Sequence, residues 1–179
     1  MAGRLTQNTE MLRNEIGPQM QMSAHIDRTG QYRFSLHRIW SDELQAATMV
    51  MLNPSTADHL RNDPTISRCI QLSRAWGFGS LNIVNLFAYR TSSPAHLRSI
   101  QRPVGKENDT HIMEQCLKAG KVIIAWGNHG SFRDRDKEVL RLLSTFDLWC
   151  IGQTKSGQPK HPLYVPGDVK LQRFRLVEP

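Results

Sequence analysis

Cysteines are few in this sequence, and long apolar runs are missing. The three cysteines, Cys69, Cys116 and Cys150, are widely spaced and form no C-x-x-C pair. This spacing argues against a disulfide framework and against a cysteine-based zinc site. No apolar stretch approaches the roughly 20 residues that a membrane-spanning helix needs, and the N-terminal residues lack the apolar core of a signal peptide. We therefore expect a cytoplasmic protein that does not bind a membrane.

Several familiar catalytic motifs are also missing. The sequence contains no Walker loop, no G-x-G-x-x-G fingerprint and no G-x-S-x-G nucleophile elbow. Its seven histidines never stand four residues apart, as a pair of metal ligands on a helix does. Paired carboxylates are missing from the ends of the strands predicted below. We therefore expect no cofactor and no metal ion, and chemistry carried out by amide and imidazole groups.

Acidic residues are outnumbered by basic ones. The 179 residues include 23 Lys and Arg against 16 Asp and Glu, which gives a net charge of +7. Such an excess favours a polyanionic partner, and nucleic acid is the commonest one. The basic residues are spread along the chain rather than clustered, so a basic surface that serves only solubility remains the alternative.

The sequence does contain a series of short apolar runs without alternation, which are typical of strands buried on both faces. Helical patterns separate these runs, which predicts a short, mostly parallel sheet covered on both faces, a three-layer α/β/α domain. The four predicted strands are residues 47–52, 81–86, 121–126 and 148–151.

Other segments complete the predicted domain. Apolar residues alternate at first over residues 32–40, which predicts an antiparallel strand at the edge of the sheet. Residues 1–28 are polar and lack clear periodicity, so we expect a loose arm or a short helix there and a single α/β domain over residues 29–179. The predicted helices begin at Asp63, near Asn108 and after Ser131.

The break at Asn53-Pro54 is the most informative point of the sequence. Pro54 disfavours helix in the residue before it, so we expect Asn53 to be extended at the end of the strand of residues 47–52. Ligands of α/β proteins bind at the carboxyl ends of such strands, and turns rich in Asn, Gly, Pro or His follow all four predicted strands. We therefore expect these turns to gather along one rim. The candidate site residues are Asn53, Ser55, Thr56, Asp63, Asn85, Tyr89, Arg90, Asn128, His129, Lys155, Lys160 and His161.

These residue types suit chemistry on a nucleobase. An asparagine holds a water through its carbonyl oxygen or reads a base edge through its donor and acceptor. A histidine donates to an oxygen that gains negative charge as a bond breaks, and Arg or Lys hold phosphates. Structural roles remain open: Asn53 as a turn residue, Asp63 as a helix cap and His161 as a surface loop residue.

Six short segments occur in order between Tyr32 and Tyr164. They are N-P-S-T-A, N-D-P-T, W-G-F-G, V-N-L-F-A, A-W-G-N-H-G and H-P-L-Y. Together they resemble an uncharacterised bacterial and phage family of domains of unknown function. This resemblance implies a shared fold and brings no function with it.

Four of the turns also carry segments similar to those of another family. These segments are Leu52-Asn53-Pro54, the strand ending at Asn85 with Arg90 and Pro94 after it, Val122 to Asn128, and His161-Pro162. In order and spacing they resemble, more distantly, the uracil-DNA glycosylase superfamily, including its G-x-N-P-G and H-P-S motifs. Two departures are Ser55 in place of a frequent Gly, and Leu163-Tyr164 in place of the Ser-Pro-Leu that wedges into DNA.

The second resemblance implies a DNA N-glycosylase-like hydrolase that acts on a flipped, modified base, as in DNA repair or modification. It implies that Asn53 positions the attacking water, that Asn85 reads the base and that His161 stabilises the departing base. Phosphate contacts are expected from Lys155, Lys160 and Arg90. Two alternatives remain open: a non-catalytic nucleic-acid-binding module with the same fold, and an enzyme that acts on free nucleotides.

Overall fold

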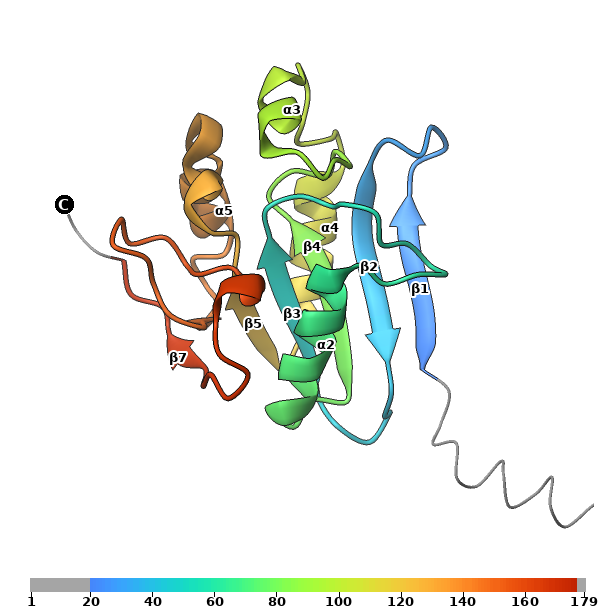
Figure 1. Cartoon of the computed structure of the whole chain (residues 1–179), viewed down its shortest axis with the longest axis vertical. Coiled ribbons are helices and arrows are strands. Elements are labelled where there is room, and N and C mark those ends of the chain that lie inside the picture. Colours follow the sequence, from blue (N-terminus) through green and yellow to red (C-terminus); the bar gives the residue numbers. More distant parts are fainter. Residues whose placement is uncertain (1–19, 177–179) are drawn as a thin grey trace, which may run out of the picture.

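A seven-stranded mixed sheet forms the centre of the computed structural model, which describes residues 20–176 (Figure 1). The strand order is β1-β2-β4-β3-β5-β6-β7. The strands are β1 (Gln21–Ile26), β2 (Arg33–Ile39), β3 (Ala46–Met51), β4 (Ser80–Asn85), β5 (Lys121–Ile124), β6 (Leu148–Cys150) and β7 (Gln172–Arg173).

The core of the sheet is parallel. Strands β4, β3, β5 and β6 run in the same direction, whereas β1, β2 and β7 pair antiparallel at the two sides. The parallel strands are the four predicted apolar runs, and residues such as Met49, Val50, Ile83 and Val84 are buried in them. The prediction of an α/β fold with a mostly parallel sheet is confirmed.

Helices cover both faces of the sheet. They are α2 (Pro64–Ala75), α3 (Pro94–Ser99), α4 (Asn108–Leu117) and α5 (Arg135–Leu142). Helix α2 packs on one face, where Ile66 joins Met49 and Ile83 in one apolar cluster. Helices α4 and α5 pack on the other face around Val50 and Val84. Figure 1 accordingly shows α2 in front of the sheet and α4 and α5 behind it.

One of the predicted helix starts differs from the structure. Helix α2 does start after Asp63, whose Oδ1 accepts from the backbone N–H of Ile66 at 2.8 Å. The helix expected after Ser131 instead begins at Arg135, because left-handed backbone conformations at Arg133 and Asp134 interrupt the preceding 3₁₀ segment η1 (Asn128–Asp134). Helix α4 begins at Asn108, as expected; its N-cap is Glu107, and the side chain of Asn108 turns inward to the end of β4.

The edge of the sheet is also not where the sequence places it. Residues 33–39 form the expected antiparallel strand, but β1 covers its outer side, so β1 is the edge strand. The prediction of a loose arm or a short helix is therefore wrong for residues 21–26; residues 1–19 lie outside the described residues. Because β1 alternates only between exposed and half-buried positions, its sequence carries a weak apolar pattern.

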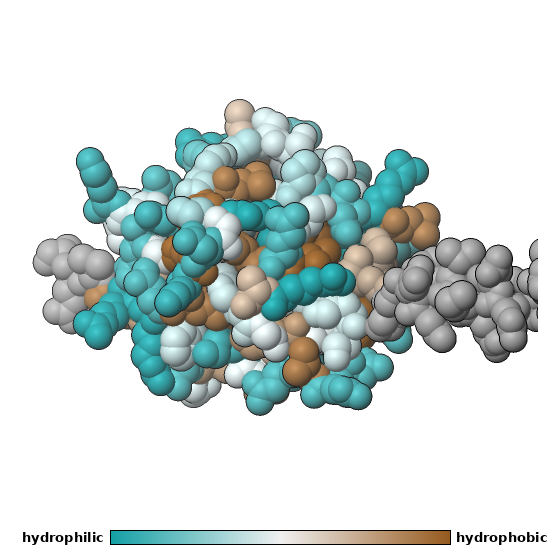
Figure 2. Space-filling model, turned by 60° about the horizontal axis from the view of Figure 1, so that its bottom comes forward, coloured by the Kyte–Doolittle hydropathy of each residue, from teal (hydrophilic) through white to brown (hydrophobic). Residues whose placement is uncertain are grey.

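The connections of the parallel strands leave a crevice at their carboxyl ends. The chain passes from β3 to its neighbour β4 through α2 on one face, and from β5 to β6 through α5 on the other. These two connections leave adjacent strands toward opposite sides, and ligands of open α/β sheets bind at such a point. The arrowhead of β3 points to the upper end of Figure 1, so the carboxyl edge lies there. Figure 2 brings the opposite, lower end forward and shows small apolar areas separated by hydrophilic side chains. The strand connections therefore favour a ligand site at the carboxyl edge.

None of the helices in residues 20–176 is long and apolar enough to span a membrane.

Candidate functional site

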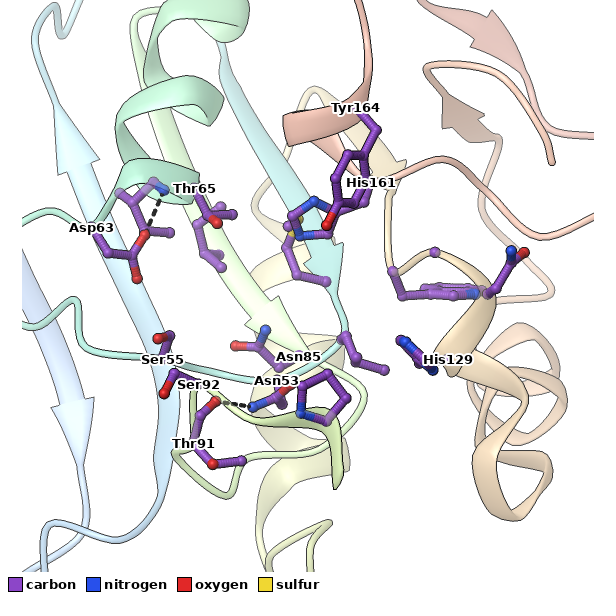
Figure 3. A pocket seen from close by; sticks show the side chains of 18 of the residues that line it. Asn53, Ser55, Asp63, Thr65, Asn85, Thr91, Ser92, His129, His161 and Tyr164 are labelled. Carbon is purple, nitrogen blue, oxygen red and sulfur yellow. Dashed lines mark hydrogen bonds between the residues drawn. The ribbon is translucent and has the colours of Figure 1, made fainter. Parts of the chain in front are cut away.

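A cavity of about 520 Å³ opens at the carboxyl ends of β3, β4 and β5 (Figure 3). Cavities that bind small ligands usually have volumes of roughly 300–1,000 Å³. Eight of the twelve candidate residues line it: Asn53, Ser55, Asp63, Asn85, Asn128, His129, Lys160 and His161. Turns far apart in the sequence thus meet around one space.

Four candidate residues lie outside this cavity. Thr56 is exposed on the turn after β3, and Lys155 is exposed on the loop after β6. Tyr89 packs edge-on against Tyr32, and the Nη1 group of Arg90 donates to the carbonyl of Gly30. Tyr89 and Arg90 lie outside because the chain after β4 first turns toward the connection between β1 and β2.

Six polar or aromatic lining residues were not predicted: Arg33, Thr65, Thr91, Ser92, Thr154 and Tyr164. Thr91 and Ser92 follow the Asn85 turn, and Tyr164 follows His161, so neighbourhood in the sequence could have suggested them. Arg33 carried no such signal, because it begins a strand that the sequence places at the edge of the sheet.

Asn53 has one amide atom bound and one unbound. Its Nδ2 donates to the carbonyl oxygens of Thr91 at 2.7 Å and of Pro54 at 3.0 Å. Carbonyl oxygens only accept, so the nitrogen must face them and Oδ1 must face the other way. Asn53 thus holds the β3 turn to the β4 turn, and its Oδ1 has no hydrogen-bond donor among the described residues.

Asn85 is arranged in the opposite sense. It is 2% exposed, and its Oδ1 accepts from Nη2 of Arg33 at 3.3 Å. A guanidinium only donates, so the oxygen must face Arg33. In Figure 3 the amide nitrogen of Asn85 lies on the cavity side. Asn85 therefore offers a donor to a ligand, whereas Asn53 offers an acceptor.

Arg33 is a buried cation beside this cavity. Its side chain is 1% exposed, and Nη1 donates to the carbonyl of Ala57 at 2.9 Å. Burial lowers the pKa of Arg33 to about 10, while the charge of Asp63 acts in the opposite direction. Arg33 makes no ion pair with the described part of the chain. A buried charge without a carboxylate partner is costly and calls for another explanation.

His161 is held as a neutral donor. It precedes the 3₁₀ turn η2 (Pro162–Tyr164), and its Nδ1 accepts from the backbone N–H of Leu163 at 3.3 Å. A neutral imidazole that accepts at Nδ1 carries its proton on Nε2. Burial lowers the pKa of His161, with Asp63 acting against the shift. The imidazole is therefore neutral at neutral pH and has one N–H to donate.

Asp63 combines a structural position with exposure to the cavity. Besides capping α2, it accepts from the backbone N–H of Ala57 through Oδ2 at 3.3 Å. In Figure 3, Asp63 and Thr65 lie on one side of the cavity, His161 and Tyr164 on the other. The Asp63 carboxylate therefore acts on the pKa of both shifted groups, Arg33 and His161, while Asp58 acts in the same direction on Arg33 alone.

The loop after β6 is tied to the turn after β5. Oδ1 of Asn128 accepts from the hydroxyls of Thr154 at 2.7 Å and Ser156 at 2.9 Å. Nε1 of Trp126 donates to Gln158 at 2.7 Å. These bonds hold the chain segment that carries Lys160 and His161 against the cavity.

Among residues 20–176, no group of three or more His, Cys, Asp or Glu side chains is arranged to hold a metal ion.

Fold and site together define an α/β protein with a polar cavity at the carboxyl edge of its parallel strands. Residues 33–163 match the model of the family described as Protein of unknown function (DUF1643), and the chain belongs to that family. The membership expected from the six sequence segments is thereby confirmed. No curated protein and no solved structure matches the chain significantly.

Proposed function

We propose that this protein is a nucleobase-directed hydrolase, similar to a DNA N-glycosylase, that acts on a base flipped out of DNA. The observation that carries the proposal is the set of three polar groups with fixed sense around one cavity. They are the acceptor Oδ1 of Asn53, the donor Nδ2 of Asn85 and the donor Nε2 of His161.

The amide of Asn53 serves hydrolysis, and the amide of Asn85 serves recognition of the base. Oδ1 of Asn53 accepts a hydrogen from a water, which turns the water's lone pair toward C1′ of the sugar. As the bond from C1′ to the base nitrogen breaks, the sugar becomes oxocarbenium-like, as in glycoside hydrolysis. Nδ2 of Asn85 donates to an acceptor on the base edge and so holds the base in place.

His161 acts on the leaving group. The base departs with the electron pair of the broken bond, and its oxygens gain negative charge. The water that adds to C1′ releases its extra proton to the solvent, and the departed base anion takes up a proton from the solvent. A neutral imidazole with a fixed N–H stabilises that charge without having to give up a proton, and one such donor is worth about 10²–10³ in rate. The buried charge of Arg33 lies behind Asn85 and favours the same anionic leaving group.

The partner follows from charge and from access. A base reaches a cavity between the strand-end turns only when it leaves the helical stack. The net charge of +7 favours the polyanionic backbone that flanks such a base. Exposed Lys155 and Lys160 stand on the loop that borders the cavity and are the expected phosphate contacts.

The test is a panel of single- and double-stranded oligonucleotides, each with one modified base, assayed for abasic sites. We expect base release with at least one substrate, and a loss of about 100-fold or more in Asn53→Ala and His161→Ala. His59→Ala replaces an exposed histidine outside the cavity and is the matched control. Melting temperatures establish that each variant is folded.

Undiminished activity in both cavity variants would overturn the catalytic assignment. Salt-dependent DNA binding without base release from any substrate would favour the non-catalytic module instead. Binding of mononucleotides as tight as that of DNA would favour an enzyme of free nucleotides.

A further inference from the structure

We propose that Arg33 is a positioning residue that fixes the hydrogen-bonding sense of Asn85, so that the cavity selects a base with an oxo group at this position over one with an amino group. This inference rests on the proposal that the cavity takes a nucleobase. It adds Arg33 to the site as a positioning residue and states which chemical group of a base the site prefers.

The sense of Asn85 is fixed because Arg33 cannot accept a hydrogen bond. If the Asn85 amide were flipped, its NH₂ group would meet the N–H groups of a guanidinium that is itself held by Ala57. Two buried donors would then face each other, and both would lose their partners. Leaving buried polar groups unpaired disfavours such an arrangement by about tenfold or more.

The ligand must match this sense. A carbonyl oxygen on the base edge accepts from Nδ2 of Asn85, whereas an exocyclic amino group meets it donor to donor. Uracil and cytosine differ in this way at one edge, and so do hypoxanthine and adenine. A site built to hydrogen-bond one group rejects an analogue that leaves its buried polar group unpaired.

The same strand offers a matched control residue. Arg38 is also on β2, is 0% exposed and holds the same turn, since its Nη2 donates to the carbonyls of Asp58 at 2.6 Å and Arg61 at 3.1 Å. Arg38 does not line the cavity. Arg38→Met therefore removes a buried guanidinium from β2 without changing the partner of Asn85.

The experiment measures dissociation constants of short single-stranded oligonucleotides with one central probe base. The probe pairs are uracil against cytosine and hypoxanthine against adenine, on 2′-fluoroarabino sugars whose glycosidic bond resists cleavage. We expect the native protein to bind the oxo member of each pair about tenfold more tightly. That ratio falls to near one in Arg33→Met and persists in Arg38→Met. It also persists in Arg33→Lys, because an ammonium likewise only donates.

Each outcome decides a different statement. Equal binding of the two members by the native protein, or an unchanged ratio in folded Arg33→Met, overturns the role of Arg33 and leaves the proposed hydrolase standing. Binding of no probe above that of an abasic oligonucleotide overturns both. If Arg33→Met does not fold, a ratio near one in the native protein, or a ratio lost in folded Arg33→Lys, still overturns the role of Arg33.

Discussion

Asn82 and Asn85 are both buried on β4, three residues apart, and they have different surroundings. Asn82 is 9% exposed, and both of its amide atoms are bound: Oδ1 pairs with Nδ1 of His37 at 2.9 Å, and Nδ2 donates to Oγ1 of Thr48 at 3.3 Å. Asn85 has its oxygen bound and its nitrogen free for a ligand. The difference teaches that burial and residue type do not identify a ligand-reading asparagine, whereas the unbound atom does.

The surroundings of Asn82 form a closed network under α4. The hydroxyl of Thr48 donates to the carbonyl of Gln115 at 2.9 Å, and the hydroxyl of Ser35 lies 3.0 Å from Nε2 of His37. The members satisfy one another, as buried polar groups in stable structures do. This face of the sheet therefore uses its asparagine for stability, and the opposite face offers its asparagine to a ligand.

The largest expected effect is on catalysis. Asn85→Ala removes the donor to the base, so the rate of abasic-site formation in single turnover should fall about 100-fold. Asn82→Ala should leave the rate close to that of the native protein. Similar losses in the two variants would show that the two asparagines do not differ in the way described.

The next largest expected effect is on stability, where Asn82→Ala should cost more than Asn85→Ala. Asn82→Ala leaves Nδ1 of His37 without its acceptor and Oγ1 of Thr48 without its donor, and we expect it to lower the free energy of unfolding by about 1–3 kcal/mol. Asn85→Ala should lower the free energy of unfolding less, because Arg33, the partner of Asn85, borders the cavity. Urea denaturation measures both. A greater loss in Asn85→Ala would contradict the assignment of Asn82 to the structural network.

Acidification should destabilise the network around Asn82 and His37. Burial lowers the pKa of His37 below its usual 6.5, and the hydrogen bond that its Nδ1–H donates to Oδ1 of Asn82 only partly opposes this. Below pH 6.5 the unfolded chain binds a proton that the folded one does not, so the free energy of unfolding should fall as the pH falls. The decline should be shallower in His37→Gln. A pH-independent stability, or an unchanged slope in this variant, would count against the buried neutral imidazole.

The smallest effect concerns a residue outside both regions. Lys155 is exposed and does not line the cavity, so Lys155→Ala should change the free energy of unfolding by no more than about 0.5 kcal/mol. If Lys155 contacts a phosphate, the slope of log affinity against log salt should fall by about 1. An unchanged slope would remove Lys155 from the DNA contact.

The sequence predicted the parallel core because each of its strands is a short apolar run that needs no distant information. It also placed Asn53, Asn85 and His161 at strand ends, and the structure brings all three to one cavity. Arg33 could not be predicted, because its role depends on Asn85, a partner 52 positions away. Because the apolar pattern of β1 is weak, the sequence did not indicate that β2 lies inside the sheet. Nor could the sequence separate Asn82 from Asn85, since their difference lies in which amide atom is bound.

The side-chain amide signals of Asn82 and Asn85 in the ¹⁵N spectrum of the native protein test the central claim most directly. The probe is the uracil oligonucleotide with the uncleavable sugar, titrated to saturation. We predict a large shift of the Asn85 NH₂ signals, because Nδ2 gains an acceptor, and little change at Asn82. Saturable binding that leaves Asn85 unmoved, or that moves Asn82 as much, would contradict the account.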